Sequence, residues 1–248
     1  MKDDFDFLTM IHEDFLARIE GSELLVKDNI SIIKSNIPSF PFNVCFVNNE
    51  NMQNQKELII NNLNIPLLIY VSSLSNTSFK SWASSNKFIY HKEFPFMFRE
   101  VQGEFFKSPH YDDIKIYRVR DEINILKDLS LLYAKSKSID VMQIYKLFQN
   151  ILPNQYFYIS YINDKPAGFF LATSLGDKGF ILDTYVEPQY RSIGLLKIMS
   201  SKVKEDITSN GVNKFHAFAM SPESENLAIQ DKYILKDNMH LWSYSPMI

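Results

Sequence analysis

The apolar positions of this 248-residue chain follow two different spacings, which predict helices and strands in alternation. Spacings of three and four residues are typical of amphipathic helices, and they occur at 5–20, 54–63, 78–86, 121–134 and 140–151. Continuous or alternating apolar runs are typical of strands, and they occur at 43–47, 65–71 and 114–119 and in two extended pieces on either side of Pro95. Helices and strands that alternate in this way favour an α/β layer structure.

Residues 156–186 carry the most regular pattern, in which three strand-like runs are separated by two short turns. The runs are 156–162, 167–174 and 180–186, and the turns read NDKP and LGDKG. Strands joined by such short turns pair with their neighbours, so the segment predicts an antiparallel meander. Further elements are predicted beyond it: an amphipathic helix from Leu195 to near Gly211, a strand at 214–220, a helix that starts at Ser221 and Pro222, and a last strand at 239–245.

The apolar periodicity lapses at 104–113, where Pro109 interrupts the chain, and this lapse predicts a domain boundary. We therefore expect a smaller α/β domain at 1–108 and a second domain at 109–248. The sequence shows no internal repeat and no low-complexity tract.

Charge and cysteine content argue against several classes of protein. The formal net charge is −3 and the pI is about 6.0, so the chain lacks the basic field that nucleic acids and anionic membrane surfaces attract. No apolar run reaches the roughly 18 residues that span a bilayer, and the acidic N-terminus does not read as a signal peptide. The single cysteine, Cys45, favours a cytoplasmic location and a structural role. The five histidines are scattered without metal-ligand spacing, so no metal is expected.

The segment YVEPQYRSIGLLKIM, residues 185–199, combines the end of a strand, a turn and the start of a helix. The N-terminus of a helix attracts an anion such as pyrophosphate, because its first N–H groups are unpaired and the helix dipole is positive there. Arg191 adds a cation to the turn. Other phosphate loops are excluded, since neither GxxxxGK[ST] nor a GxGxxG after a strand occurs.

This segment resembles the acetyl-CoA signature of the GNAT superfamily of N-acetyltransferases, in which a strand ending in Val-x-Pro leads through Tyr-Arg-Gly-x-Gly into a helix. The match covers Val186, Pro188, Tyr190, Arg191 and Gly194, and it departs at Ser192 and Leu196. A second match follows at the family's spacing, with Asn226 and Tyr233 on the next helix, although Asp237 and Asn238 stand where the family has Gly-Phe. NDKPAGFFLAT resembles the family's turn and third strand, with Gly168 in the usual place, and the whole resemblance spans 114–248.

The resemblance implies a GNAT-type fold, with a mixed, mostly antiparallel central sheet flanked by helices. In the sequence this fold is preceded by a smaller, noncatalytic α/β domain that is itself degenerate and GNAT-like. It implies acetyl-CoA as the cosubstrate, with its pyrophosphate on the backbone amides of the turn. The pantetheine arm would pair with the strand that ends at Val186, where that strand splays from 214–220. The implied cofactor-binding residues are Val186, Arg191, Ser192, Ile193, Gly194, Leu195, Leu196 and Asn226.

Direct attack of an amine on a thioester needs a neutral amine and a proton for the departing thiolate. Tyr233 matches the family's general acid, and Asp183 is the candidate base or the group that steers the cationic amine. The implied activity is a cytoplasmic N-acetyltransferase that transfers an acetyl group from acetyl-CoA to a primary amine of a small molecule or peptide. The expected assembly is a monomer or a homodimer.

Each of these residues also has a purely structural interpretation. Tyr233 could be one of 13 tyrosines that pack helix against sheet, Arg191 could pair with a surface carboxylate, and Asp183 could bond a neighbouring backbone amide. The departures from the family pattern favour a degenerate member that senses CoA or binds a partner without catalysis. The pair of Asn226 and Tyr233 favours an enzyme.

Overall fold

The computed structural model describes residues 2–16, 19, 21–27, 30–35, 37, 42–48, 56–101, 113–120, 122–152 and 155–245. The chain divides into two compact units. Unit 1 comprises residues 1–97 and 218–248, and unit 2 comprises residues 98–217. The expected boundary at 108/109 lies outside the described residues, so it stays a prediction.

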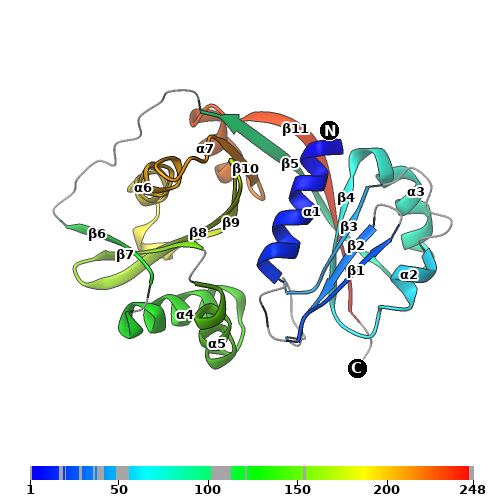
Figure 1. Ribbon diagram of the computed structural model, residues 1–248, viewed down its shortest axis with the longest axis horizontal. Coiled ribbons are helices and arrows are strands. Elements are labelled where there is room, and N and C mark those ends of the chain that lie inside the picture. Colours follow the sequence, from blue (N-terminus) through cyan, green and yellow to red (C-terminus); the bar gives the residue numbers. More distant parts are fainter. Residues whose placement is uncertain are drawn as a thin grey trace. The chain divides into compact units, whose positions relative to one another are not determined.

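The sheet of unit 2 is built around the expected meander (Figure 1). Its strands are β6 (Ile114–Arg118), β7 (Tyr156–Ile162), β8 (Lys165–Leu175), β9 (Lys178–Val186) and β10 (Lys214–Phe218), in the spatial order β10-β9-β8-β7-β6. Strands β6 to β9 pair antiparallel, and β10 pairs parallel with β9. Parallel neighbours need a crossover connection, and α6 (Leu195–Thr208) provides it.

Helices cover both faces of this sheet, with α6 on one face and α4 (Ile123–Lys137) and α5 (Val141–Ile151) on the other (Figure 1). Every residue of β7 is buried as a result. Asp140 caps α5, because its carboxylate accepts hydrogen bonds from the N–H groups of Met142 and Gln143, both at 3.0 Å.

Unit 1 also contains strands of mixed direction. Its elements are α1 (Lys2–Leu16), β1 (Glu23–Lys27), β2 (Ile30–Lys34), β3 (Val44–Val47), α2 (Lys56–Ile60), β4 (Leu67–Ser72), α3 (Ser73–Ser84), α7 (Pro222–Gln230) and β11 (Ile234–Tyr244). Their strand order is β1-β2-β3-β4-β11, antiparallel except for the parallel pair of β3 and β4. A further strand, β5 (Ile89–Glu100), begins in unit 1 and ends in unit 2.

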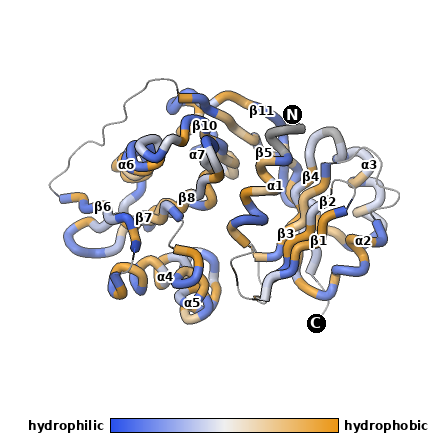
Figure 2. The backbone as a smooth tube through the Cα atoms, viewed as in Figure 1, coloured by the Kyte–Doolittle hydropathy of each residue, from blue (hydrophilic) through white to orange (hydrophobic). Residues whose placement is uncertain are grey.

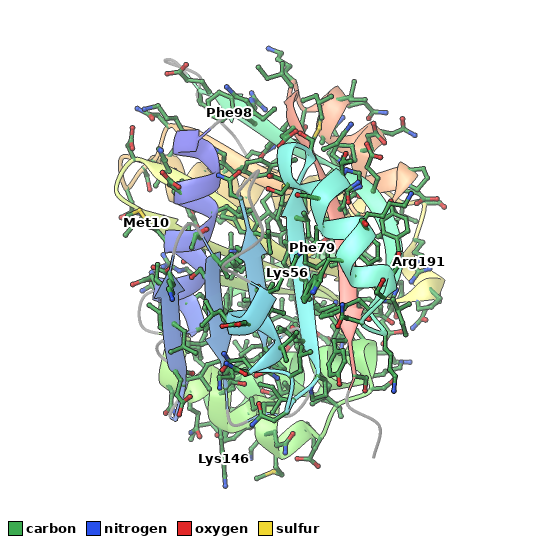
Figure 3. All side chains as sticks on the ribbon, turned by 90° about the vertical axis from the view of Figure 1, so that its right-hand side faces the viewer. Met10, Lys56, Phe79, Phe98, Lys146 and Arg191 are labelled. Carbon is green, nitrogen blue, oxygen red and sulfur yellow. The ribbon has the colours of Figure 1, made fainter. Side chains whose placement is uncertain are left out.

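Strands β2 and β3 are buried at nearly every residue, and their mostly apolar sequences colour them largely orange in Figure 2. On the face covered by α2 and α3, Phe79 packs edge-on against Trp242 at 5.5 Å between ring centroids (Figure 3). On the face covered by α1, the His12 ring packs edge-on against Phe46 at 4.8 Å. Alternation along β3 separates the two sets of side chains, because Phe46 points to one face and its neighbours Cys45 and Val47 point to the other.

The structure contains the predicted helices and strands, with shifted bounds at several of them, such as α3, which begins at Ser73 and not at 78. The two extended pieces around Pro95 form the single strand β5, in which the Pro95 carbonyl accepts a hydrogen bond from the Ala219 N–H at 3.0 Å. The hairpin of β1 and β2 was not predicted. The last strand, β11, begins at Ile234, five residues before the expected start at 239.

The two units repeat one order of elements, although the sequence shows no repeat. In unit 1 the antiparallel run β1-β2-β3 is followed by α2 and by β4, which lies parallel to β3. In unit 2 the antiparallel run β7-β8-β9 is followed by α6 and by β10, which lies parallel to β9. Both units are therefore mixed, mostly antiparallel sheets flanked by helices, as the fold-class prediction states.

Candidate functional site

Strand β9 changes its pairing halfway along its length. Its register with β10 ends at the pair Ile181 and Ala217, whereas its register with β8 continues to Val186. Between the pairs formed by Ile181 and Asp183 the register with β8 shifts, so Leu182 is an extra residue in β9. Such a bulge bends and twists the strand that carries it. The second half of β9 therefore has one edge on β8 and turns its other edge away from the β10 register.

A tight turn joins the end of β9 to α6. It contains the 3-10 helix η2 (Pro188–Tyr190), and it places two residues in the left-handed region, Ser192 at φ 68° and Gly194 at φ 79°. Gly194 is the N-cap of α6, and a Cβ added there would meet no atom within 4 Å. The Arg191 Nε donates a hydrogen bond to the Val186 carbonyl at 3.1 Å, which ties the turn to the strand. Arg191 is exposed and labelled in Figure 3.

The first turn of α6 settles the orientation of two candidate residues. Leu195 is buried in the core, at 1% exposure, whereas Leu196 is only half-buried and Arg191, Ser192, Ile193 and Gly194 are exposed. Leu195 therefore lies on the buried apolar face of the helix, as expected, whereas Leu196 is only partly covered. Exposed N–H groups at the start of a 14-residue helix are what an anion needs.

Asp183 lies directly after the bulge and forms an ion pair that the sequence did not predict. Its Oδ2 lies 2.6 Å from the Lys137 Nζ, at the last residue of α4, and its Oδ1 accepts a hydrogen bond from the Thr184 N–H at 2.9 Å. Burial raises the pKa of the Asp183 carboxyl above its ordinary value, and the Lys137 ammonium opposes this rise. The expectation that Asp183 bonds a neighbouring amide is thus confirmed, together with a cationic partner.

A second ion pair lies beside the first, on residues that sequence reasoning missed. The buried Glu187 carboxylate lies 2.7 Å from the Lys135 Nζ, and it also accepts a hydrogen bond from the Tyr185 hydroxyl at 3.5 Å. The Tyr185 ring stacks on Phe169 at 5.6 Å. Alternation along β9 gives the available signal, because residues 183, 185 and 187 share one face of an extended chain.

Asn226 and Tyr233 belong to unit 1, whereas the other candidate residues belong to unit 2. Asn226 is exposed on α7, whose start is fixed by a capping box between Ser221 and Ser224. Tyr233 follows α7 and is 5% exposed, and its N–H donates to the Ala228 carbonyl at 2.9 Å.

Asp237, one of the departures from the family pattern, has a local structural role. Its carboxylate accepts a hydrogen bond from the Ser73 hydroxyl at 2.5 Å. Ser73 is the first residue of α3, where the helix dipole favours a negative charge. The residue is therefore explained within unit 1 without reference to a ligand.

Other chemistry is not evident in the described ranges. No group of three or more His, Cys, Asp or Glu side chains there is arranged to hold a metal ion. Cys45 is buried, and burial raises the pKa of its thiol. None of the helices in the part of the chain described by the structure is both long and apolar enough to cross a membrane.

The fold resembles that of several solved structures. No protein-family model and no curated protein matches the sequence. A GCN5-related N-acetyltransferase from Kribbella flavida superposes with a TM-score of 0.71 and 9% identity, over 97% of this chain and 95% of that chain. Another from Sphaerobacter thermophilus gives a TM-score of 0.62 and 12% identity, over 95% and 86%.

The chain therefore has the GNAT fold of the GCN5-related N-acetyltransferases. A tandem GNAT protein from the clavulanic acid biosynthesis pathway gives a TM-score of 0.61 and 10% identity, over 96% of this chain and 89% of that chain. This likeness extends over both units and agrees with the repeated order of elements described above.

Proposed function

We propose that the protein is an N-acetyltransferase that transfers the acetyl group of acetyl-CoA to a primary amine of a small molecule or peptide by direct attack. The observation that carries the proposal is the path of β9. Its register with β10 ends at Ile181, yet the strand continues to Val186 and leads through an exposed turn into the N-terminus of α6. A free strand edge that leads to a helix N-terminus suits a cofactor with an amide-containing arm and a pyrophosphate.

In this proposal each part of the cofactor has its own binding group. The N–H groups from Arg191 to Leu196 hold the pyrophosphate, and glycine is needed only where a side chain would strain the backbone or collide with the ligand. Gly194 meets this need. The amides of the pantetheine arm pair with the edge of β9 before Val186, as an added strand would.

Asp183 and Tyr233 take the two proton-transfer roles. Asp183 takes a proton from the acceptor ammonium, to which its raised pKa adapts it. Tyr233 donates its phenolic proton to the departing thiolate, and Asn226 contacts the cofactor. The Lys137 ammonium pairs with Asp183, so an acceptor amine has to replace it.

A second candidate function is a GNAT-fold module that binds CoA or a partner without catalysis. The half-buried Leu196 favours it, because this side chain lies in the first helical turn beside the proposed pyrophosphate site. The enzyme and a CoA-sensing module both bind the cofactor, but only the enzyme releases CoA thiol in the presence of an amine.

The test has two stages. Acetyl-CoA is titrated into the protein by calorimetry, with CoA as a comparison, and CoA release is then followed by thiol detection with a panel of primary amines. Binding followed by amine-dependent thiol release supports the enzyme. Binding without release under any amine supports the CoA-binding module, and the absence of binding at millimolar acetyl-CoA excludes the enzyme and leaves only a partner-binding module.

A further inference from the structure

The chain holds one of its own primary amines against the predicted catalytic carboxylate. The Lys137 Nζ lies 2.6 Å from the Asp183 Oδ2. The ammonium also lies 5.8 Å from the centroid of the Tyr133 ring, one helical turn earlier on α4. Two contacts therefore fix the nitrogen at the β9 face of the helix end.

The acyl group of the cofactor would arrive at the same point, and this step rests on the proposed function. From Val186 back to Leu182 the extended chain covers about 13 Å, at about 3.3 Å per residue. A pantetheine arm is about as long as four residues of extended chain. With the pyrophosphate on the turn after Val186, the thioester reaches the bulge at Leu182, next to Asp183.

A second lysine in the same helical turn provides a contrast. Lys135 pairs with Glu187 at 2.7 Å, and its side chain is 62% exposed, whereas that of Lys137 is 33% exposed. Glu187 lies beyond the end of β9, near the pyrophosphate end of the proposed cofactor path. Lys135 is thus the more accessible amine, and Lys137 is the one beside the acyl end.

We infer that Lys137 is a self-acetylation site, with the chain's own lysine as an acceptor of the acetyl group. The Lys137 ammonium gives one proton to the Asp183 carboxylate, and the neutral nitrogen attacks the thioester carbonyl carbon. The N–C bond forms and the C–S bond breaks, and the departing thiolate takes a proton from the general acid of the proposed function to become CoA thiol, while the second amine proton restores that acid. Asp183 then returns its proton to water. The product is a neutral amide, which releases the Asp183 carboxylate from its ion pair.

The raised pKa of the Asp183 carboxyl supports this transfer, because a carboxylate that binds its proton more readily is a better acceptor from an ammonium. The αL residue Ser138, at φ 56°, ends α4 directly after Lys137. The nitrogen is therefore carried by the last residue of a helix, and its side chain is 33% exposed.

The test incubates the full-length protein with acetyl-CoA and no added amine, and it measures acetylation by intact mass and by peptide mapping. We expect acetylation of Lys137 at least tenfold faster than that of Lys135. Uncatalysed transfer in solution follows exposure and gives the opposite order. Equal or reversed rates at the two lysines would overturn the inference.

Two variants, one of them with a matched control, test the roles of the acceptor lysine and of the carboxylate. Lys137→Arg removes the acceptor and keeps a cation for Asp183, whereas Lys135→Arg is the control that leaves self-acetylation unchanged. Asp183→Asn is expected to slow acetylation of Lys137 at least tenfold. If circular dichroism shows that Asp183→Asn does not fold, the two arginine variants still test the inference: self-acetylation should be lost in Lys137→Arg and kept in Lys135→Arg.

The outcomes separate this inference from the proposed function. If acetyl-CoA binds and an added amine is acetylated while Lys137 stays unmodified, only the self-acetylation is overturned. If acetyl-CoA does not bind, both are overturned.

Discussion

The carbonyl oxygen of Tyr185 lies 2.6 Å from the position that a Cβ on Gly168 would take. Gly168 pairs with Val186 across β8 and β9, and Tyr185 pairs with the next residue, Phe169, so the close approach is diagonal. A glycine at this position lets β9 approach β8 closely just before the turn that leads to α6. The geometry of the candidate site therefore depends on a missing side chain.

Gly168→Ala is expected to lower the free energy of unfolding by about 2 kcal/mol, because the new methyl group collides with the Tyr185 carbonyl oxygen, which the paired strands hold in place. Gly179→Ala is the matched control. Its Cβ would lie 3.2 Å from a Val212 methyl group, and a side chain can shift where backbone cannot. Urea denaturation of both variants measures the difference. Equal losses in the two variants would contradict the role of the close approach.

Gly194→Ala and Gly211→Ala form a pair that separates backbone strain from ligand binding. Both glycines have positive φ, 79° and 88°, and a Cβ at either would meet no atom within 4 Å. Each substitution is expected to cost about 1 kcal/mol of stability. Only Gly194→Ala should also weaken acetyl-CoA binding in calorimetry, because its methyl group points into the proposed phosphate turn. Equal affinities in the two variants would count against that turn as the binding site.

Tyr233→Phe is expected to lower kcat by about a hundredfold or more with little change in acetyl-CoA affinity, because the phenolic proton is lost while the ring remains. Tyr244→Phe, which removes another tyrosine hydroxyl from unit 1, is the control with unchanged kcat. The measurement is steady-state CoA release with an amine that the panel identifies. An unchanged kcat in Tyr233→Phe would remove this residue from the acid role.

The stability of the protein should fall with acidification between pH 6.5 and pH 4 through His12. Burial lowers the pKa of His12 from 6.5 to about 4, while its Nδ1–H donates to the Leu8 carbonyl at 2.8 Å. In this interval the unfolded chain binds a proton at His12 and the folded chain does not, so acid favours unfolding, by at most about 3 kcal/mol. Urea denaturation at pH 6.5, 5.5 and 4.5 measures the loss.

His12→Met removes the titrating ring at the same position on α1. The difference in unfolding free energy between the wild type and the variant should then change with pH in this interval, while contributions from carboxylates cancel. A difference that stays constant from pH 6.5 to pH 4.5 would show that His12 is not buried in its neutral form.

The sequence predicted those elements whose formation depends on local spacing. The meander, the helix that follows Asp140 and the helix that follows Gly194 each have a signal within a few residues. The hairpin of β1 and β2 lacked one, because β1 is exposed at four of its five residues and so carries no buried face. The sequence pattern predicts two separate extended pieces on either side of Pro95, yet the structure has one strand there. A strand tolerates proline where the missing N–H is not required for pairing.

The sequence supplied the candidate site residues, which stay a prediction, but it could not supply their contacts. The turn from Arg191 to Leu196 is a contiguous motif, whereas the ion pair of Lys137 and Asp183 joins residues 46 positions apart. The bulge at Leu182 has no glycine or proline to announce it. Neither feature has a local signal, because each arises only when α4, β8 and β9 pack together.

The crossover helices of the two units differ in length, and this difference predicts how many acetyl-CoA molecules one chain binds. α6 has 14 residues, whereas α2, which makes the same connection between β3 and β4, has five. A helix of little more than one turn has few aligned peptide dipoles with which to hold a pyrophosphate. If acetyl-CoA binds as proposed, only the longer helix α6 suits its pyrophosphate, so a calorimetric titration should saturate at one acetyl-CoA per chain, even though the architecture of the fold occurs twice.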